Sequence, residues 1–177
     1  MITVITATTQ GREELLAECK ASVAAQTHPV AHHLVLLDDK RVGGAHTKNA
    51  LLEQVTTEWA IVLDDDDLLD PEYVERLIAH AEDADVIYGW CRTTGATLDS
   101  YNQTFNAPLL EGGASIVSHC ALFRTDFARK AGGFKPVAGY DFKMWQEMLR
   151  LGARFVSVPE VLWTYRLNTE WAHESRP

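Results

Sequence analysis

Four consecutive aspartates at residues 64–67 are the side chains of this sequence whose types and spacing most directly suggest chemistry. Residues 59–63 precede them as a short apolar run, which has the length of a strand buried on both faces. Asp70, Pro71 and Glu72 follow, and these residue types favour the start of a helix. Adjacent carboxylates repel one another, so a divalent cation that prefers oxygen ligands, Mg²⁺ or Mn²⁺, would stabilise them. The alternative is a solvated acidic loop, but apolar residues on both sides anchor this one.

Polar side chains also end the two strands that are predicted before the acidic run. Thr6 and Thr8 lie at the end of the first strand, and Asp38 and Asp39 lie at the end of the second. In an open α/β sheet, ligands bind beyond the carboxyl ends of the strands. We therefore expect these side chains and residues 64–67 to converge on one rim of the sheet.

The periodicity of the apolar residues predicts strands that alternate with helices. The expected elements are strands over residues 2–6, 33–37, 59–63, 84–90, 115–123 and 155–158, and helices over residues 15–23, 45–55, 70–81, 125–130 and 140–151. Residues 93–113 are expected to form loops and short strands, and residues 161–166 an aromatic segment. This alternation favours an α/β fold with a largely parallel sheet.

The last predicted helix has a carboxylate at the head of an apolar face. Asp141, Met144, Trp145, Met148 and Leu149 share one side of this helix, because they follow one another at offsets of three, four, seven and eight residues. The arrangement favours a chemical role for the carboxylate. The structural alternative is that an Asp in the first turn simply interacts well with the helix dipole.

Length, composition and charge limit the class of protein. The chain has 177 residues, 46% of them hydrophobic, which is enough for one domain with a core. A net charge of −9 disfavours broad, nonspecific binding to nucleic acid. The apolar runs are far shorter than the roughly 20 residues that cross a bilayer, and the N-terminus lacks the basic residues of a signal peptide. Cys19, Cys91 and Cys120 have no metal-like spacing. We therefore expect a cytoplasmic protein with reduced thiols and no transmembrane segment.

Several motifs, taken in order, resemble those of family-2 glycosyltransferases with the GT-A fold. They cover nearly the whole chain, and their order and spacing are more specific than any single motif: Val4-Ile-Thr-Ala-Thr-Thr9, Leu36-Leu-Asp-Asp39, Gly44-Ala-His-Thr-Lys-Asn49, Leu63-Asp-Asp-Asp-Asp67, Leu122-Phe-Arg124, Gly132-Gly-Phe134, Tyr140-Asp141 and Trp163-Thr-Tyr-Arg166. The resemblance implies a single GT-A domain over residues 1–177, with a mixed, mostly parallel sheet flanked by helices. It also implies that residues 1–92 bind a nucleotide sugar and that residues 93–177 bind an acceptor.

The activity that this resemblance implies is transfer of a sugar from a nucleotide-diphosphate sugar to an acceptor hydroxyl. In such enzymes a divalent metal, Mn²⁺ or Mg²⁺, binds an Asp-x-Asp motif, and a carboxylate base assists inversion at the anomeric carbon. The roles carried over are donor binding for Thr6, Thr8, Asp38, Asp39, Lys48 and Asp64, metal binding for Asp64 and Asp66, catalysis for Asp141, and possible acceptor or metal contacts for His119, Trp145 and His173.

Some of these assignments have structural alternatives. Lys48 stands where the family often has Arg, and its alternative is a surface position on a helix. Asp38 and Asp39 could merely end a strand. For His119, in a predicted strand, we favour a structural role over an acceptor contact. Among the four aspartates, Asp65 is the one that we expect to be dispensable.

Two other functions compete with the transferase. A nucleotide-sugar-binding protein could keep the fold without turnover, because fold alone does not determine activity. A haloacid-dehalogenase-like phosphatase is also suggested, because Asp64 and Asp66 follow an apolar strand. In that superfamily, however, the aspartates lie on the first strand, and here two strand-helix units come before them.

Overall fold

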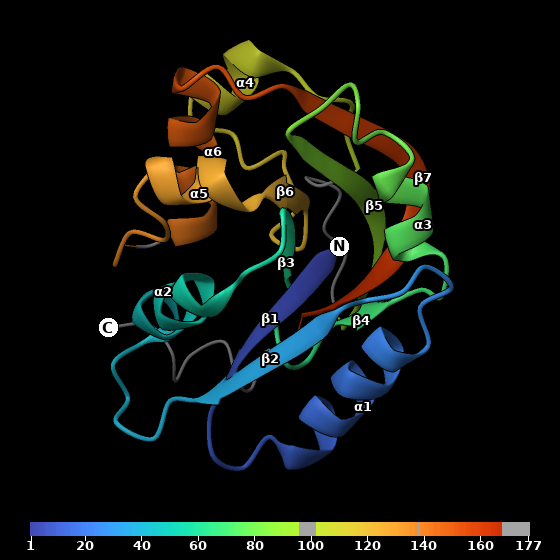
Figure 1. The fold of residues 1–177 in the computed structure, drawn as a ribbon, viewed down its shortest axis with the longest axis vertical. Coiled ribbons are helices and arrows are strands. Elements are labelled where there is room, and N and C mark those ends of the chain that lie inside the picture. Colours follow the sequence, from blue (N-terminus) through green and yellow to red (C-terminus); the bar gives the residue numbers. More distant parts are fainter. Residues whose placement is uncertain (96–101, 138, 168–177) are drawn as a thin grey trace.

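In the residues that the structure describes, 1–95, 102–137 and 139–167, the chain forms a seven-stranded sheet with helices on both faces (Figure 1). The structure is a computed structural model. The strands lie in the order β2-β1-β3-β6-β5-β7-β4. Their bounds are β1 Ile2–Thr8, β2 His32–Leu37, β3 Trp59–Val62, β4 Leu68–Leu69, β5 Val86–Thr94, β6 Leu122–Arg124 and β7 Phe155–Arg166.

Most of the paired residues in the sheet lie in parallel ladders, as the sequence predicts, although three of the six strand pairings are antiparallel. β1 pairs in parallel with β2 and with β3, and β5 pairs in parallel with β7. β6 is antiparallel to both of its neighbours, β3 and β5, and the short β4 is antiparallel to β7. The predicted α/β fold with a mixed, mostly parallel sheet is thus confirmed. Because β6 lies between β3 and β5, strands from both predicted halves of the chain belong to the same sheet.

A buried apolar cluster on each face holds the helices against the sheet. The helices are α1 Glu13–Ala24, α2 Gly44–Gln54, α3 Tyr73–Ile78, α4 Ala107–Glu111, α5 Thr125–Lys130 and α6 Tyr140–Arg150. α1 and α3 cover one face, and α2, α4, α5 and α6 cover the other. None of the helices in the described residues is both long and apolar enough to cross a membrane.

The structure differs from the predicted elements in three places. Of residues 115–123, only the last two belong to a strand, which is β6. The predicted strand 155–158 and the aromatic segment 161–166 form one long strand, β7, whose register against β5 shifts between Gly89 and Cys91. α4 and β4 were not predicted, because elements of five and two residues are too short to show a periodic pattern.

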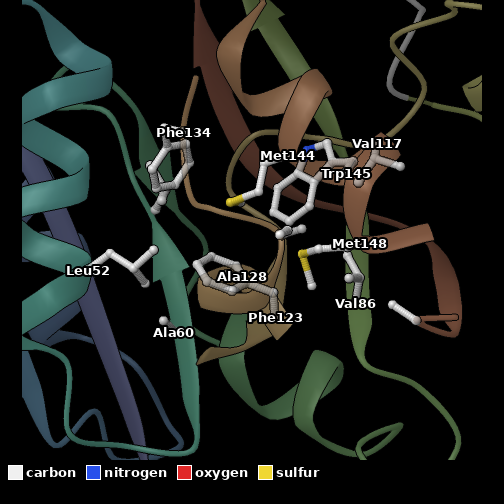
Figure 2. Close-up of a cluster of buried hydrophobic side chains, with 14 of the residues drawn as sticks. Leu52, Ala60, Val86, Val117, Phe123, Ala128, Phe134, Met144, Trp145 and Met148 are labelled. Atoms are coloured by element: carbon white, nitrogen blue, oxygen red, sulfur yellow. The ribbon is translucent and has the colours of Figure 1, made fainter. Parts of the chain in front are cut away.

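The apolar face of α6 packs into the core and thereby positions Asp141 at the start of that helix. Met144, Trp145 and Met148 are buried, as the sequence predicts. Figure 2 shows them in the cluster that also contains Phe123. The ring centroids of Phe123 and Trp145 lie 5.6 Å apart in an edge-to-face arrangement. Because these three side chains of α6 are buried, the helix cannot rotate about its axis without exposing large apolar groups.

A pair of hydrogen bonds joins α2 to the segment that leads to α6. The Asn49 side chain donates from Nδ2 to the Phe134 carbonyl, and its Oδ1 accepts from the Phe134 N–H, both at 2.8 Å. Gly133 adopts a φ of +64°, and a Cβ at this position would lie 2.3 Å from Asn49 Oδ1. The link therefore requires glycine at this position. It also holds Lys48, the neighbour of Asn49, in place relative to the segment before Asp141.

Because of this link, we expect Gly133→Ala to destabilise the protein strongly. We expect the free energy of unfolding to fall by about 3 kcal/mol, because a left-handed backbone costs about 1–2 kcal/mol and each lost hydrogen bond about 1 kcal/mol. Gly11→Ala is the matched control. Gly11 has a φ of +85°, but a Cβ there meets nothing within 4 Å, so only the backbone cost is expected. Urea unfolding measures both variants, and equal losses would contradict a role for the contact with Asn49.

Candidate functional site

The acidic run forms a turn at the carboxyl end of β3. The Asp67 N–H donates to the Asp64 carbonyl at 3.1 Å. Asp65 and Asp67 are buried, whereas Asp64 and Asp66 are partly exposed. Because β1 pairs in parallel with both β2 and β3, the ends of these three strands lie on the same rim. This convergence is what the sequence predicts.

Thr8 and Arg12 hold two of the aspartates from the start of the chain. The Thr8 hydroxyl donates to Asp65 Oδ2 at 2.6 Å. The Arg12 guanidinium donates from Nε to the same oxygen at 2.9 Å, and its Nη2 lies 2.7 Å from Asp65 Oδ1 and 2.6 Å from Asp66 Oδ2. Burial alone would lower the pKa of Arg12, but the negative charges of Asp66 and Asp65 outweigh it and raise that pKa.

His119 and Asp67 form a buried ion pair. His119 Nε2 lies 2.7 Å from Asp67 Oδ2, and the Arg166 N–H donates to Asp67 Oδ1 at 2.9 Å. Burial disfavours the charged imidazole, but the hydrogen bond to Asp67 and the charge of Asp64 outweigh it and raise the pKa of His119 to about 9. Burial raises the pKa of Asp67 to about 6. The pairing joins the acidic run to the segment before β6, which is a structural contact of the kind that the sequence favours for His119.

Lys48 connects the acidic run to Asp141 of α6. Its Nζ lies 2.8 Å from Asp64 Oδ1 and 3.8 Å from Asp141 Oδ1, and its side chain is only 1% exposed. Burial alone would raise the pKa of Asp64, but Lys48 and then His119 outweigh it, and the pKa falls to about 2. Burial raises the pKa of Asp141, and Lys48 opposes this rise. Within the described residues, Asp141 Oδ1 is a buried oxygen without a hydrogen-bond partner.

The loop after β2 uses Asp38 and leaves Asp39 facing solvent. Asp38 Oδ1 and Oδ2 accept from the N–H groups of Val42 and Gly43, each at 2.8 Å. These bonds shape the loop that leads into α2. Asp39 is exposed. Of the two predicted donor contacts, Asp39 is thus the one whose position leaves it accessible to a ligand.

Two other predicted residues, Thr6 and Trp145, are not brought to the acidic run. Thr6 is fully buried, and its hydroxyl lies 2.9 Å from His33 Nε2. Trp145 lies in the core with 1% of its surface exposed, so its contact with an acceptor stays a prediction without support from its position. His173 lies outside the described residues.

Arg12 and Asp67 are the site residues that the sequence analysis missed, and Asp65 is the one that it undervalued. Asp65, which we expected to be dispensable, is buried and bonded to both Thr8 and Arg12. A signal was available for Arg12. It is the first basic residue of the chain and follows the first strand, and buried carboxylates need positive partners.

Two sets of residues are candidates for binding a metal ion, one from the structure and one, Asp64 and Asp66, predicted from the sequence. Within the described residues, Asp64, Asp67 and His119 place one ligand atom each within 4.8 Å of one another. The predicted ligand Asp66 is not in this group, and Arg12 binds its Oδ2. Both sets include Asp64, and carboxylate oxygens are the ligands that Mg²⁺ and Mn²⁺ prefer.

Comparison with known protein families shows to which family this chain belongs. The profile of Glycosyl transferase family 2 matches residues 34–145, which contain the acidic run, Lys48, His119 and Asp141. The chain belongs to glycosyl transferase family 2. No protein with a curated function matches the sequence.

Solved structures show the same fold as this family-2 chain. The structure of S. aureus TarS 1-349 has a TM-score of 0.74 and 16% sequence identity, with 93% of this chain and 60% of that one covered. A TarS structure in complex with UDP-GlcNAc has a TM-score of 0.74 at 16% identity, covering 94% and 58%. The mannosyltransferase PcManGT from Pyrobaculum calidifontis, in complex with GDP-Man and Mn²⁺, has a TM-score of 0.72 at 16% identity, covering 97% and 58%. The chain thus spans about 60% of each of these solved chains, and the predicted GT-A fold is confirmed.

Proposed function

We propose that this chain transfers a sugar from a nucleotide-diphosphate sugar to an acceptor hydroxyl, with inversion at the anomeric carbon. The observation that carries the proposal is the meeting of Asp64, Lys48 and Asp141. Lys48 bridges the two carboxylates, which come from the two segments expected to bind donor and acceptor. Family membership and the fold support the reaction class. In this proposal residues 1–92 bind the donor, and residues 93–177 bind the acceptor.

Asp141 is the proposed general base. Its buried Oδ1, without a hydrogen-bond partner among the described residues, can accept a bond from an acceptor hydroxyl. In the reaction this hydroxyl gives its proton to the Asp141 carboxylate, and its oxygen forms a bond to the anomeric carbon. The bond from that carbon to the diphosphate oxygen breaks on the opposite side, which inverts the configuration. Lys48 holds Asp141 and favours its ionised form, while burial limits competing water.

We propose Asp64 and Asp66 as the metal ligands, in preference to the group with Asp67 and His119. Asp67 is completely buried, and both of its oxygens already accept hydrogen bonds. Asp66 is 17% exposed and is bonded by Arg12 near the surface, so its oxygen is freed at lower cost. A bound Mn²⁺ or Mg²⁺ would offset the charge of the diphosphate as it departs.

Charge on the rim also supports a metal-bound donor. Three positive side chains, Arg12, Lys48 and His119, face the acidic run and Asp141. The five carboxylates therefore exceed the positive groups by two. A diphosphate would meet net negative charge here unless a divalent cation arrived with it.

The exposed Asp39 at the end of β2 is the proposed contact to the nucleobase.

The first experiment is a screen of nucleotide sugars with Mn²⁺ by thermal shift. UDP-GlcNAc and GDP-Man are included, because similar proteins were solved with these donors. A donor at 100 times its dissociation constant should stabilise the protein by about 2.7 kcal/mol. Release of nucleoside diphosphate on addition of candidate acceptors then tests transfer. Tight donor binding without any release would favour the binding protein without turnover.

The proposed nucleobase contact predicts that Asp39→Ala weakens binding of the selected nucleoside diphosphate. A carboxylate can accept a hydrogen bond from a base N–H, and sites built for such a bond discriminate strongly against ligands that lack it. We expect a loss of about tenfold or more in affinity, since a hydrogen bond to a charged group is worth about 1.5–3 kcal/mol. Affinity for Mn²⁺ alone should not change. Equal nucleotide affinities of wild type and variant by calorimetry would refute the contact.

The metal assignment predicts different effects for two substitutions. Asp66→Asn should fold normally but lose Mn²⁺ affinity by about tenfold or more, since even outer-shell changes cost metal sites 10- to 100-fold. It should also lose Mn²⁺-dependent donor affinity. His119→Gln is the control, because the amide can still donate to Asp67 but the imidazole ligand is gone. Calorimetric titration with Mn²⁺ measures both, and a larger loss in His119→Gln would show that the other set binds the metal.

The base assignment predicts that Asp141→Asn separates turnover from donor binding. The amide keeps the size of the side chain but is not basic, so we expect turnover to fall by about 10² to 10⁴ fold while donor affinity survives. If Asp141 only stabilised the start of α6, the variant would lose about 1 kcal/mol of stability and keep its turnover. Rates of nucleoside diphosphate release and the melting temperature, measured on one preparation, distinguish these roles. Normal turnover with a lowered melting temperature would exclude the base.

A further inference from the structure

Arg12 binds one carboxylate oxygen of Asp66, which is a proposed metal ligand. Its Nη2 lies 2.6 Å from Asp66 Oδ2 and 2.7 Å from Asp65 Oδ1. Both side chains of this ion pair are partly exposed, 15% for Arg12 and 17% for Asp66. An arginine and a divalent cation compete for the same lone pairs, and both cannot hold one carboxylate oxygen in the same direction.

We propose that Arg12 is a built-in counterion of Asp66 that a divalent cation has to displace. In this view Arg12 stabilises the acidic turn when no metal is bound and lowers the affinity of the site for free metal. Arg12 is then a positioning residue with two alternative arrangements. The inference rests on the proposed metal role of Asp64 and Asp66, and it adds the competitor that sets their affinity.

The geometry favours Arg12 over the other two cations for this role. Lys48 is 1% exposed, and it bridges Asp64 and Asp141. His119 is paired with the fully buried Asp67. Moving either group would leave a charge buried and unpaired, which is a large cost. Arg12 can release Asp66 at the surface without that cost.

Arg12 also has an anchor that remains when Asp66 is released. Its Nε donates to Asp65 Oδ2 at 2.9 Å, and Nη2 also faces Asp65 Oδ1. Only the bond to Asp66 has to break, so the guanidinium can stay on Asp65 and the loop between β1 and α1 can keep its place. The buried Asp65 thus acts as the fixed support for an exchangeable contact.

The test is calorimetric titration of the intact chain with Mn²⁺ alone, which needs neither donor nor acceptor. Arg12→Met keeps the length of the side chain but removes its charge and its hydrogen bonds. We expect Mn²⁺ to bind it about tenfold more tightly than wild type, because a hydrogen bond to a charged group no longer has to be broken. The control is Arg76→Met, which removes the same charge from α3, where Arg76 forms an exposed pair with Glu72, the residue before the helix. It should change Mn²⁺ affinity less than twofold.

Two further variants keep the test decisive. Arg12→Lys should give a smaller gain than Arg12→Met, since one ammonium replaces the guanidinium fork with a point charge. If Arg12→Met does not fold, a gain in Arg12→Lys still supports the proposal. Adding Asp66→Asn to Arg12→Met should remove the gain. Mn²⁺ affinity that stays the same or falls in the folded Arg12 variants would overturn the proposal.

The proposed function and this inference fail in different ways. Donor binding and release of nucleoside diphosphate test the transferase and do not depend on how Arg12 affects free Mn²⁺. Absence of Mn²⁺ binding by wild type and Arg12→Met alike would overturn the role of Arg12, whereas nucleoside diphosphate binding in EDTA would still be measurable. A tighter Mn²⁺ site without any binding of nucleotide sugars would uphold the role of Arg12 and count against the transferase.

Discussion

The site depends on one constraint: carboxylates that are taken out of water need positive partners. Arg12, Lys48 and His119 supply them for the acidic run. These three residues come from the loop before α1, from α2 and from the segment before β6. The turn after β3 is therefore connected electrostatically to elements that are far apart in the sequence. Removing a single partner would leave a charge unpaired, which makes the arrangement cooperative.

Apolar packing determines where those partners can lie. The buried face of α6, shown in Figure 2, fixes the start of that helix, and β6 places the residues around His119 next to β3 in the middle of the sheet. The bonds of Asn49 with Phe134 connect the two sets of elements. The distances of Lys48 to Asp64 and Asp141 are thus a consequence of core packing on one face of the sheet. Electrostatics then stabilises a geometry that the core has already imposed.

The pairing of the four aspartates with positive side chains changes which charges a metal at this site would neutralise. Repulsion within the acidic run is largely relieved by the protein itself, because each of the four aspartates already has a partner. A metal would instead compensate the charge of an incoming diphosphate, which finds more negative than positive side chains on the rim. The metal would therefore be needed by the ligand more than by the fold.

The sequence by itself determined the α/β class, the strand ends that meet at one rim, the apolar side of α6 and the family, because these depend on local periodicity and on motifs in order. It indicated Asp64, Lys48 and Asp141 but not their contacts. Only the tertiary structure decided that Arg12 pairs with Asp65 and Asp66 and that Asp67 binds a buried His119. It also decided that Thr6 and Trp145 are buried. Such partners are selected by strand order and packing across many residues, which no local pattern of side chains contains.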